Sequence, residues 1–156
     1  MKKLLGLFLF VGMTSQSYAG GFVSSFGGSA STSDPTVEYV VLKNGESTSV
    51  AKGRLMTLDT SNDDGVTMKL TTTQTTPALC VAAETIAAAA FGKCQTYGYI
   101  DTLFVDGATS AVTAGARVGP SVTDGYADGN TTGLPVGIAY DSSSASESIE
   151  AFIMLR

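Results

Sequence analysis

The sequence contains no histidine and no tryptophan, and only 15% of its 156 residues are charged. Without histidine there is no Ser-His-Asp or Cys-His pair, no histidine general base and no histidine metal ligand. A hydrolase with paired carboxylates would not need histidine, but no two acids are set apart by their spacing. We therefore expect a protein that is not an enzyme, with no catalytic residue, no cofactor and no metal.

Basic residues are also scarce, with nine Lys and Arg against fourteen Asp and Glu and a net charge of −5. No run of Lys or Arg occurs, and contacts with phosphates need clustered basic side chains. We therefore expect no nucleic-acid partner. The acidic segments 59–64 and 124–128 offer oxygen ligands but lack the spacing of a calcium-binding loop. Turns in solvent are the better interpretation, because Asp, Asn and Gly dominate turns.

Long apolar stretches are limited to residues 4–13, close to the N-terminus. Two lysines precede this run, and the polar segment after it ends in Ser-Tyr-Ala, which is the layout of a secretory signal peptide cleaved after Ala19. The run is too short for a transmembrane helix, so we expect no membrane association of the mature protein. The alternative is that residues 1–19 are retained as an apolar segment that packs on a partner subunit.

Residues 20–36 are rich in Gly and Ser, with Phe22, Val23 and Phe26 as isolated apolar side chains. This composition is typical of a flexible arm or linker. The alternative is an arm that contacts a neighbouring subunit through Phe22, Val23 and Phe26. We expect the remaining residues, 37–156, to form one β-barrel domain.

Turn residues recur every 8–12 positions from residue 37 onward, and short β-branched or alternating segments lie between them. No amphipathic helix of useful length is apparent. The expected strands are 37–42, 47–50, 54–59, 66–72, 79–83, 93–105, 111–113, 116–118, 135–140 and 148–155. Asn44-Gly45 predicts a tight hairpin between the first two. The pattern predicts an all-β fold, a small antiparallel β-barrel or sandwich with a flexible N-terminal arm.

Both cysteines, Cys80 and Cys94, flank an Ala-rich connector between two expected strands. In an exported protein they could form a disulfide, whereas in a reducing cytosol both would be small buried apolar residues. They lack CxxC spacing, which argues against a metal or redox site. We assign Tyr97, Tyr99 and Phe104 to core and inter-subunit packing, not to a ligand platform.

Several short motifs follow one another in this part of the chain. They are Cys80-Val81-Ala82-Ala83, Gln95-Thr96-Tyr97-Gly98-Tyr99-Ile100, Val112-Thr113-Ala114-Gly115-Ala116-Arg117-Val118 and Gly133-Leu134-Pro135-Val136-Gly137-Ile138-Ala139. Their order resembles that of the head decoration (capsid cement) proteins of tailed bacteriophages, over residues 37–156. Members of that family are small β-barrels, often trimers, that sit on the outer shell and brace capsomers. The resemblance implies a structural virion protein on the capsid surface, partnered by the major capsid protein or shell lattice and by other copies.

The signal-like N-terminus supports an alternative, an exported bacterial surface or filament subunit. In that case Ala19 would be the cleavage point, Cys80 and Cys94 would be oxidised, and the freed arm would add a strand to the next subunit. Phage head proteins assemble in the cytoplasm, so the two interpretations differ in the fate of residues 1–19.

Overall fold

The computed structural model describes residues 36–62, 64–130 and 133–155, which form nine strands and no helix. The strands are β1 (Glu38–Asn44), β2 (Leu55–Leu58), β3 (Thr67–Leu70), β4 (Cys80–Ala82), β5 (Phe91–Asp106), β6 (Arg117–Pro120), β7 (Ala127–Asp128), β8 (Gly137–Ala139) and β9 (Ser146–Met154). The predicted all-β fold class is confirmed. Within these ranges, no helix is long and apolar enough to cross a membrane. The predictions for residues 1–19, and for Phe22, Val23 and Phe26, lie outside the described residues.

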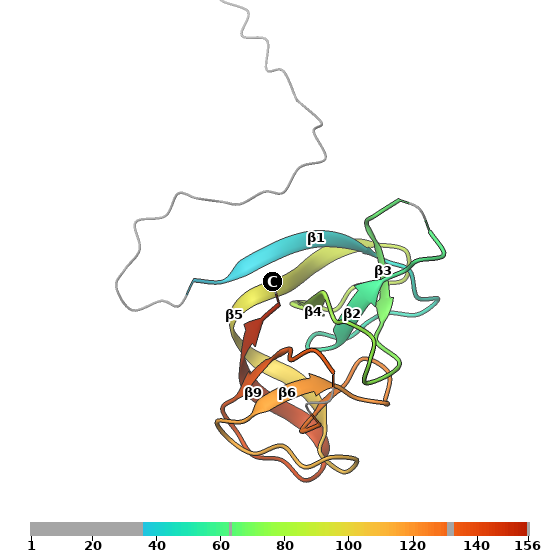
Figure 1. Ribbon diagram of the computed structural model, residues 1–156. Coiled ribbons are helices and arrows are strands. Elements are labelled where there is room, and N and C mark those ends of the chain that lie inside the picture. The colour runs from blue at the N-terminus through green and yellow to red at the C-terminus, as the bar shows by residue number, and fades with distance from the viewer. Residues whose placement is uncertain (1–35, 63, 131–132, 156) are drawn as a thin grey trace, which may run out of the picture.

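The nine described strands belong to one sheet that closes on itself twice, and β5 takes part in both closures (Figure 1). The strand order β1-β3-β2-β4-β5 is closed by pairing between β1 and β5, and we call this the first ring. The order β5-β7-β6-β8-β9 is closed by pairing between β5 and β9, and we call this the second ring. Because β5 is 16 residues long, its first half serves the first ring and its second half the second ring.

Most strand pairs are antiparallel, as expected, but β1–β3 and β5–β7 are parallel, so the sheet is mixed. The expected strand 111–113 is reduced to a bridge between Val112 and Ser143. The predicted hairpin at Asn44-Gly45 is wrong, since β1 pairs with β5 and β3 and not with the segment that follows it. That segment forms a loop whose contact with the rest of the sheet includes a bridge between Val50 and Ile86.

Asn44 explains why the hairpin does not form. Its side chain is fully buried, and its amide nitrogen donates hydrogen bonds to the carbonyls of Thr48, Ile86 and Ala87. Its side-chain oxygen accepts a hydrogen bond from the backbone N–H of Glu46. The residue thus joins the loop after β1 to the Ala-rich connector before β5, and a solvent-exposed turn would forfeit these bonds.

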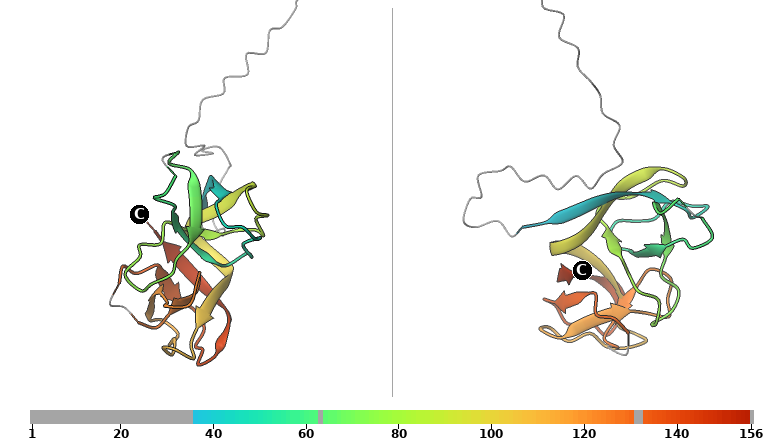
Figure 2. Two further views of the ribbon diagram at one scale, coloured as in Figure 1. Left: turned by 90° about the vertical axis from the view of Figure 1, so that its right-hand side faces the viewer. Right: turned by 45° about the horizontal axis from the view of Figure 1, so that its top comes forward.

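Two apolar clusters fill the rings, as the two views of Figure 2 help to follow. The cluster inside the first ring comprises Val50, Met56, Met68, Cys80, Ala82, Ile86 and Cys94. A disulfide joins Cys80 to Cys94, with their Cα atoms 5.5 Å apart. The second cluster lies among β5–β9 and also includes Leu55 and Val81 of the first ring. Because side chains alternate along a strand, Cys80 and Val81 face different clusters, and the outer side of β2 and β4 is covered by the second ring.

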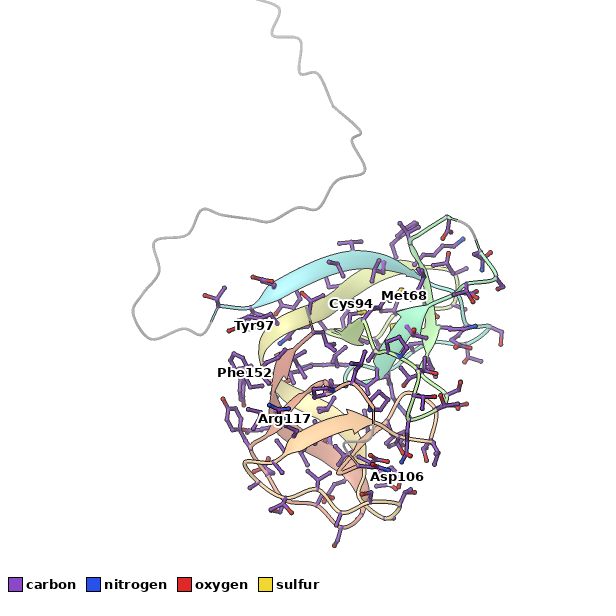
Figure 3. The ribbon with its side chains drawn as sticks, viewed as in Figure 1. Met68, Cys94, Tyr97, Asp106, Arg117 and Phe152 are labelled. Atoms are coloured by element: carbon purple, nitrogen blue, oxygen red, sulfur yellow. A yellow bond between two sulfur atoms is a disulfide. The ribbon has the colours of Figure 1, made fainter. Side chains whose placement is uncertain are left out.

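Asp106, the last residue of β5, joins the loops at one end of the second ring (Figure 3). Its buried carboxylate accepts hydrogen bonds from the hydroxyls of Thr109, Thr123 and Ser146. The bonds from Thr123 and then Thr109 are the main reasons that the pKa of Asp106 falls from 3.8 to about 2. The charged form of this side chain therefore holds together three segments that are distant in the sequence.

We expect Asp106→Asn to lower the free energy of unfolding at pH 7 by about 2 kcal/mol, because a charged acceptor with several donors is lost. Since folding lowers the pKa of Asp106, the wild-type protein keeps this stabilisation above about pH 4 and loses it as the pH falls toward about 2. Urea unfolding of the wild-type and Asp106→Asn proteins, from pH 7 down to about pH 2, measures the difference between their free energies of unfolding. Asp124→Asn, at an exposed position, is the control. If the two free energies of unfolding did not approach each other at low pH, the charge of the Asp106 carboxylate would not be the source of the stabilisation.

Candidate assembly surface

Two carboxylates of the acidic segment 59–64 accept hydrogen bonds from residues of their own loop. Asp59 accepts hydrogen bonds from Ser61 and Asn62, and the bonds from Ser61 are the first cause that lowers its pKa from 3.8 to about 2. Asp64 accepts bonds from Val66 and Thr67, chiefly the Thr67 hydroxyl, which lowers its pKa as well. No group of three or more His, Cys, Asp or Glu side chains placed to hold a metal occurs in the described ranges. The chemistry of these loops is that of turns.

An apolar surface lies where β1 and the start of β5 run side by side (Figure 1). Val40 and Leu42 pack on the cluster inside the first ring, so the alternate residues of β1 point outward. On β5, Phe91 lies opposite Lys43, and Lys93 lies opposite Val41. We call the outer surface formed by Tyr39, Val41, Lys43, Phe91 and Lys93 the β1–β5 face.

Three large side chains of the β1–β5 face are well exposed, with 47% of Tyr39, 61% of Val41 and 63% of Phe91 open to solvent. The outer side of β2 and β4 is buried by the second ring, but the equivalent side of β1 has no such cover among the described residues. Lys43 and Lys93 flank the apolar side chains in a protein whose net charge is negative. An apolar patch framed by charges is typical of an interaction surface.

A hollow of about 310 Å³ continues the β1–β5 face toward the second ring. Tyr39, Gln95 and Tyr99 are among the residues that line it. Gln95 is buried, and its amide donates hydrogen bonds to the carbonyls of Gly98 and Tyr99. An ion pair of 2.7 Å between Lys52 and Asp101 also lines the hollow, and its hydrogen bond lowers the pKa of Asp101. The amide nitrogen of Gln95 and the charges of Lys52 and Asp101 in the lining of this hollow thus already have partners within the chain.

The edge of β1 that faces away from β5 is open over much of its length. β3 meets this edge only at Lys43 and Asn44. The N–H of Asn44 donates toward β5, to Ala90, whereas that of Lys43 donates to Val66 on the opposite side. Because peptide groups alternate in direction along a strand, those of Tyr39 and Val41 point toward the open edge. No strand in the described part of the chain pairs with them there, and such an edge is a template for pairing with another chain.

Tyr97, Tyr99 and Phe104, which the sequence analysis assigned to packing, each form a ring pair within the chain. The pairs are Tyr97–Phe152, Tyr99–Tyr140 and Phe104–Tyr126, with ring centres 5.1, 5.9 and 5.7 Å apart. Tyr97 and Phe152 are seen on the same side of the molecule in Figure 3. The guanidinium of Arg54 lies over both rings of the third pair. Tyr97, Tyr99 and Phe104 are only partly buried and belong to neither apolar cluster, so they pack at the surface and not in the core. Their part in inter-subunit packing stays a prediction.

Sequence reasoning did not single out Tyr39, Val41 or Phe91. One feature could have done so, since residues 37–42 are apolar on both sides of the strand apart from Glu38. A strand with one solvated side would alternate apolar and polar residues, whereas a strand covered on both sides need not. The excess of apolar residues in 37–42 would therefore have predicted that both sides of this strand are apolar.

No protein-family model matches this sequence, and no curated protein matches it either. The structure is similar to that of the head fiber gp8.5 N base in bacteriophage phi29, with a TM-score of 0.54 and 15% sequence identity. The similarity covers 76% of this chain and 94% of that chain. The chain therefore has the fold of a phage head fiber base, which confirms, at the level of the fold, the resemblance to proteins of the phage head.

Proposed function

We propose that the protein is a structural component of a phage virion, a decoration (cement) protein that stabilises the head from the capsid surface. The observation that carries this proposal is the β1–β5 face, an exposed apolar surface beside an open strand edge in a fold shared with a phage head fiber base. Its partners would be the major capsid protein or shell lattice and other copies of itself, for example in a trimer. It would need no catalytic residue.

Burial of the β1–β5 face would supply the free energy of attachment. Tyr39, Val41 and Phe91 are each about half exposed, so covering them contributes about 1 kcal/mol each by the usual relation between buried apolar area and free energy. A contact of this size is weak for one subunit, but a subunit that engages the lattice at several points is held far more tightly. Lys43 and Lys93 would favour a partner surface with acidic residues around an apolar centre.

The test compares binding to phage heads assembled without the protein. We expect the double variant Val41→Ser/Phe91→Ser to bind at least about tenfold more weakly, because about 2 kcal/mol of apolar burial is lost. Co-sedimentation with the heads over a range of protein concentrations measures the affinity.

The matched control is Val122→Ser/Leu134→Ser, which removes two similarly exposed apolar side chains from loops of the second ring. Its binding should equal that of the wild-type protein. Unchanged binding of the Val41→Ser/Phe91→Ser variant, with the same thermal unfolding as wild type, would argue against the β1–β5 face as the attachment surface.

The disulfide between Cys80 and Cys94 favours the second candidate, an exported bacterial surface or filament subunit, because disulfides persist in oxidising compartments. Mass spectrometry of the N-terminal peptide in native material distinguishes the two functions. A chain that begins at Gly20 would support export, and a chain that keeps residues 1–19 in purified particles would support the virion protein.

A further inference from the structure

We propose that the N-terminal arm, residues 20–35, of one copy adds a strand to the open edge of β1 in a second copy. This inference rests on the proposed function and deepens it, because it names the contact through which copies of the protein join. The edge supplies the backbone groups, and the β1–β5 face beside it supplies the apolar surface.

The acceptor is well defined by the described residues. The peptide groups of Tyr39 and Val41 point away from β5, while β3 closes the same edge only from Lys43 onward. A strand laid along this edge would extend the sheet by hydrogen bonds to Tyr39 and Val41 and would place every second side chain next to the β1–β5 face. The open edge of β1 would therefore best accommodate a short segment whose apolar residues are two or four positions apart.

The arm has this spacing. In an extended segment Phe22, Ser24 and Phe26 point to one side, and Val23 and Ser25 to the other. If the side that carries Phe22 and Phe26 is also the side of the β1–β5 face, the two phenylalanine rings would lie beside Tyr39 and Val41. Asp34 is the sole charged residue in 20–35, so the added strand would bring no charge into the apolar patch.

The way in which the chain enters β1 indicates that the arm pairs with β1 of a second copy and not with β1 of its own chain. The backbone at Thr36 lies tightly against β5, since a Cβ on Gly98 would come within 2.4 Å of the Thr36 carbonyl oxygen. Asp34-Pro35 precedes it, and the residue before a proline prefers an extended backbone. The described chain thus begins at Thr36 on the side of β5, so an arm bound to the open edge of its own β1 would have to reverse its direction. The ten residues 27–36 can span about 33 Å, enough to reach a neighbouring copy.

Two full-length variants separate the donor from the acceptor. Val41→Pro removes the N–H that points to the open edge without removing one that faces β5, and proline is tolerated in edge strands. Phe22→Ser/Phe26→Ser removes the two phenylalanine side chains of the arm and alters no residue of the described fold. The matched arm control is Ser29→Ala/Ser31→Ala. If Val41→Pro unfolds at a lower temperature than wild type by more than a few degrees, Tyr39→Pro replaces it, since the N–H of Tyr39 also points to the open edge.

Sedimentation velocity in the absence of phage heads measures self-association. We expect the wild-type protein and the arm control to associate, and each test variant alone to associate at least about tenfold more weakly. An equimolar mixture of Val41→Pro and Phe22→Ser/Phe26→Ser should regain a 1:1 complex, because the first still offers an arm and the second still offers an edge.

A monomeric wild-type protein, or a mixture that associates no better than its components, would overturn the inference. So would a Val41→Pro variant that associates as wild type does. These results do not depend on attachment to the shell. A protein that self-associates through its arms but does not bind phage heads would support this inference and refute the proposed function. A protein that binds phage heads but stays monomeric would refute this inference and support the proposed function.

Discussion

Replacement of both Cys80 and Cys94 by alanine should lower the free energy of unfolding by about 3 kcal/mol. The disulfide closes a loop with a sequence separation of 14, and a crosslink over a loop of this length restricts the unfolded chain by about that amount. Both residues are fully buried in the cluster of the first ring, which also contains Met56 and Met68. Figure 3 labels Cys94 and Met68 of this cluster. The loss of two sulfur atoms from this cluster adds to the effect.

Urea unfolding of the wild-type and double-alanine proteins measures this difference. The sequence contains only these two cysteines, so wild-type protein in a strong reductant is a direct control and should lose most of the same stability. The double-alanine protein should not respond to reductant. A wild-type protein whose unfolding midpoint is the same with and without reductant would show that the crosslink is absent or contributes nothing.

Asn44→Ala should lower the free energy of unfolding by about 3 kcal/mol. The substitution removes the hydrogen bonds that the buried Asn44 amide donates to three carbonyls and accepts from the N–H of Glu46, and each such bond contributes about 0.5–1.5 kcal/mol. The carbonyls of Ile86 and Ala87 keep their bonds from the N–H groups of Val50 and Ala90, so the loss comes from the Asn44 bonds themselves. Asn44→Asp should be at least as harmful, because it directs a carboxylate at carbonyl oxygens.

Chemical denaturation of both Asn44 variants tests this expectation. The control is Asn62→Ala, at an exposed position where the amide bonds to Asp59, and it should cost less than about 1 kcal/mol. If Asn44→Ala were as mild as the control, Asn44 would have to be an ordinary turn residue, as the hairpin prediction assumed. A large effect would instead show that it anchors the loop after β1 to the connector before β5.

Local sequence patterns predicted the parts of this fold that depend on neighbouring residues. The expected strands 93–105 and 148–155 correspond to β5 and β9, because β-branched and aromatic residues with alternating burial favour an extended chain wherever it pairs. The turns at Gly53 and Gly115, where φ is positive, were recognisable for a similar reason, since they depend on the backbone freedom of one or two residues, but the turn at Asn44-Gly45 was predicted wrongly. The same patterns predicted that the described residues contain no helix.

The other features of the fold depend on contacts between segments that are far apart in the sequence. The sequence by itself determined that the described residues form an all-β fold, and that the chain has no histidine to contribute to a site. The tertiary structure alone decided that β5 is shared by two rings, that Asn44 is an anchor and not a turn, and that the outer side of β1 remains open while that of β2 and β4 is buried. The physical reason is that strand pairing and burial depend on segments far away in the chain, and no local pattern records which face the second ring will cover.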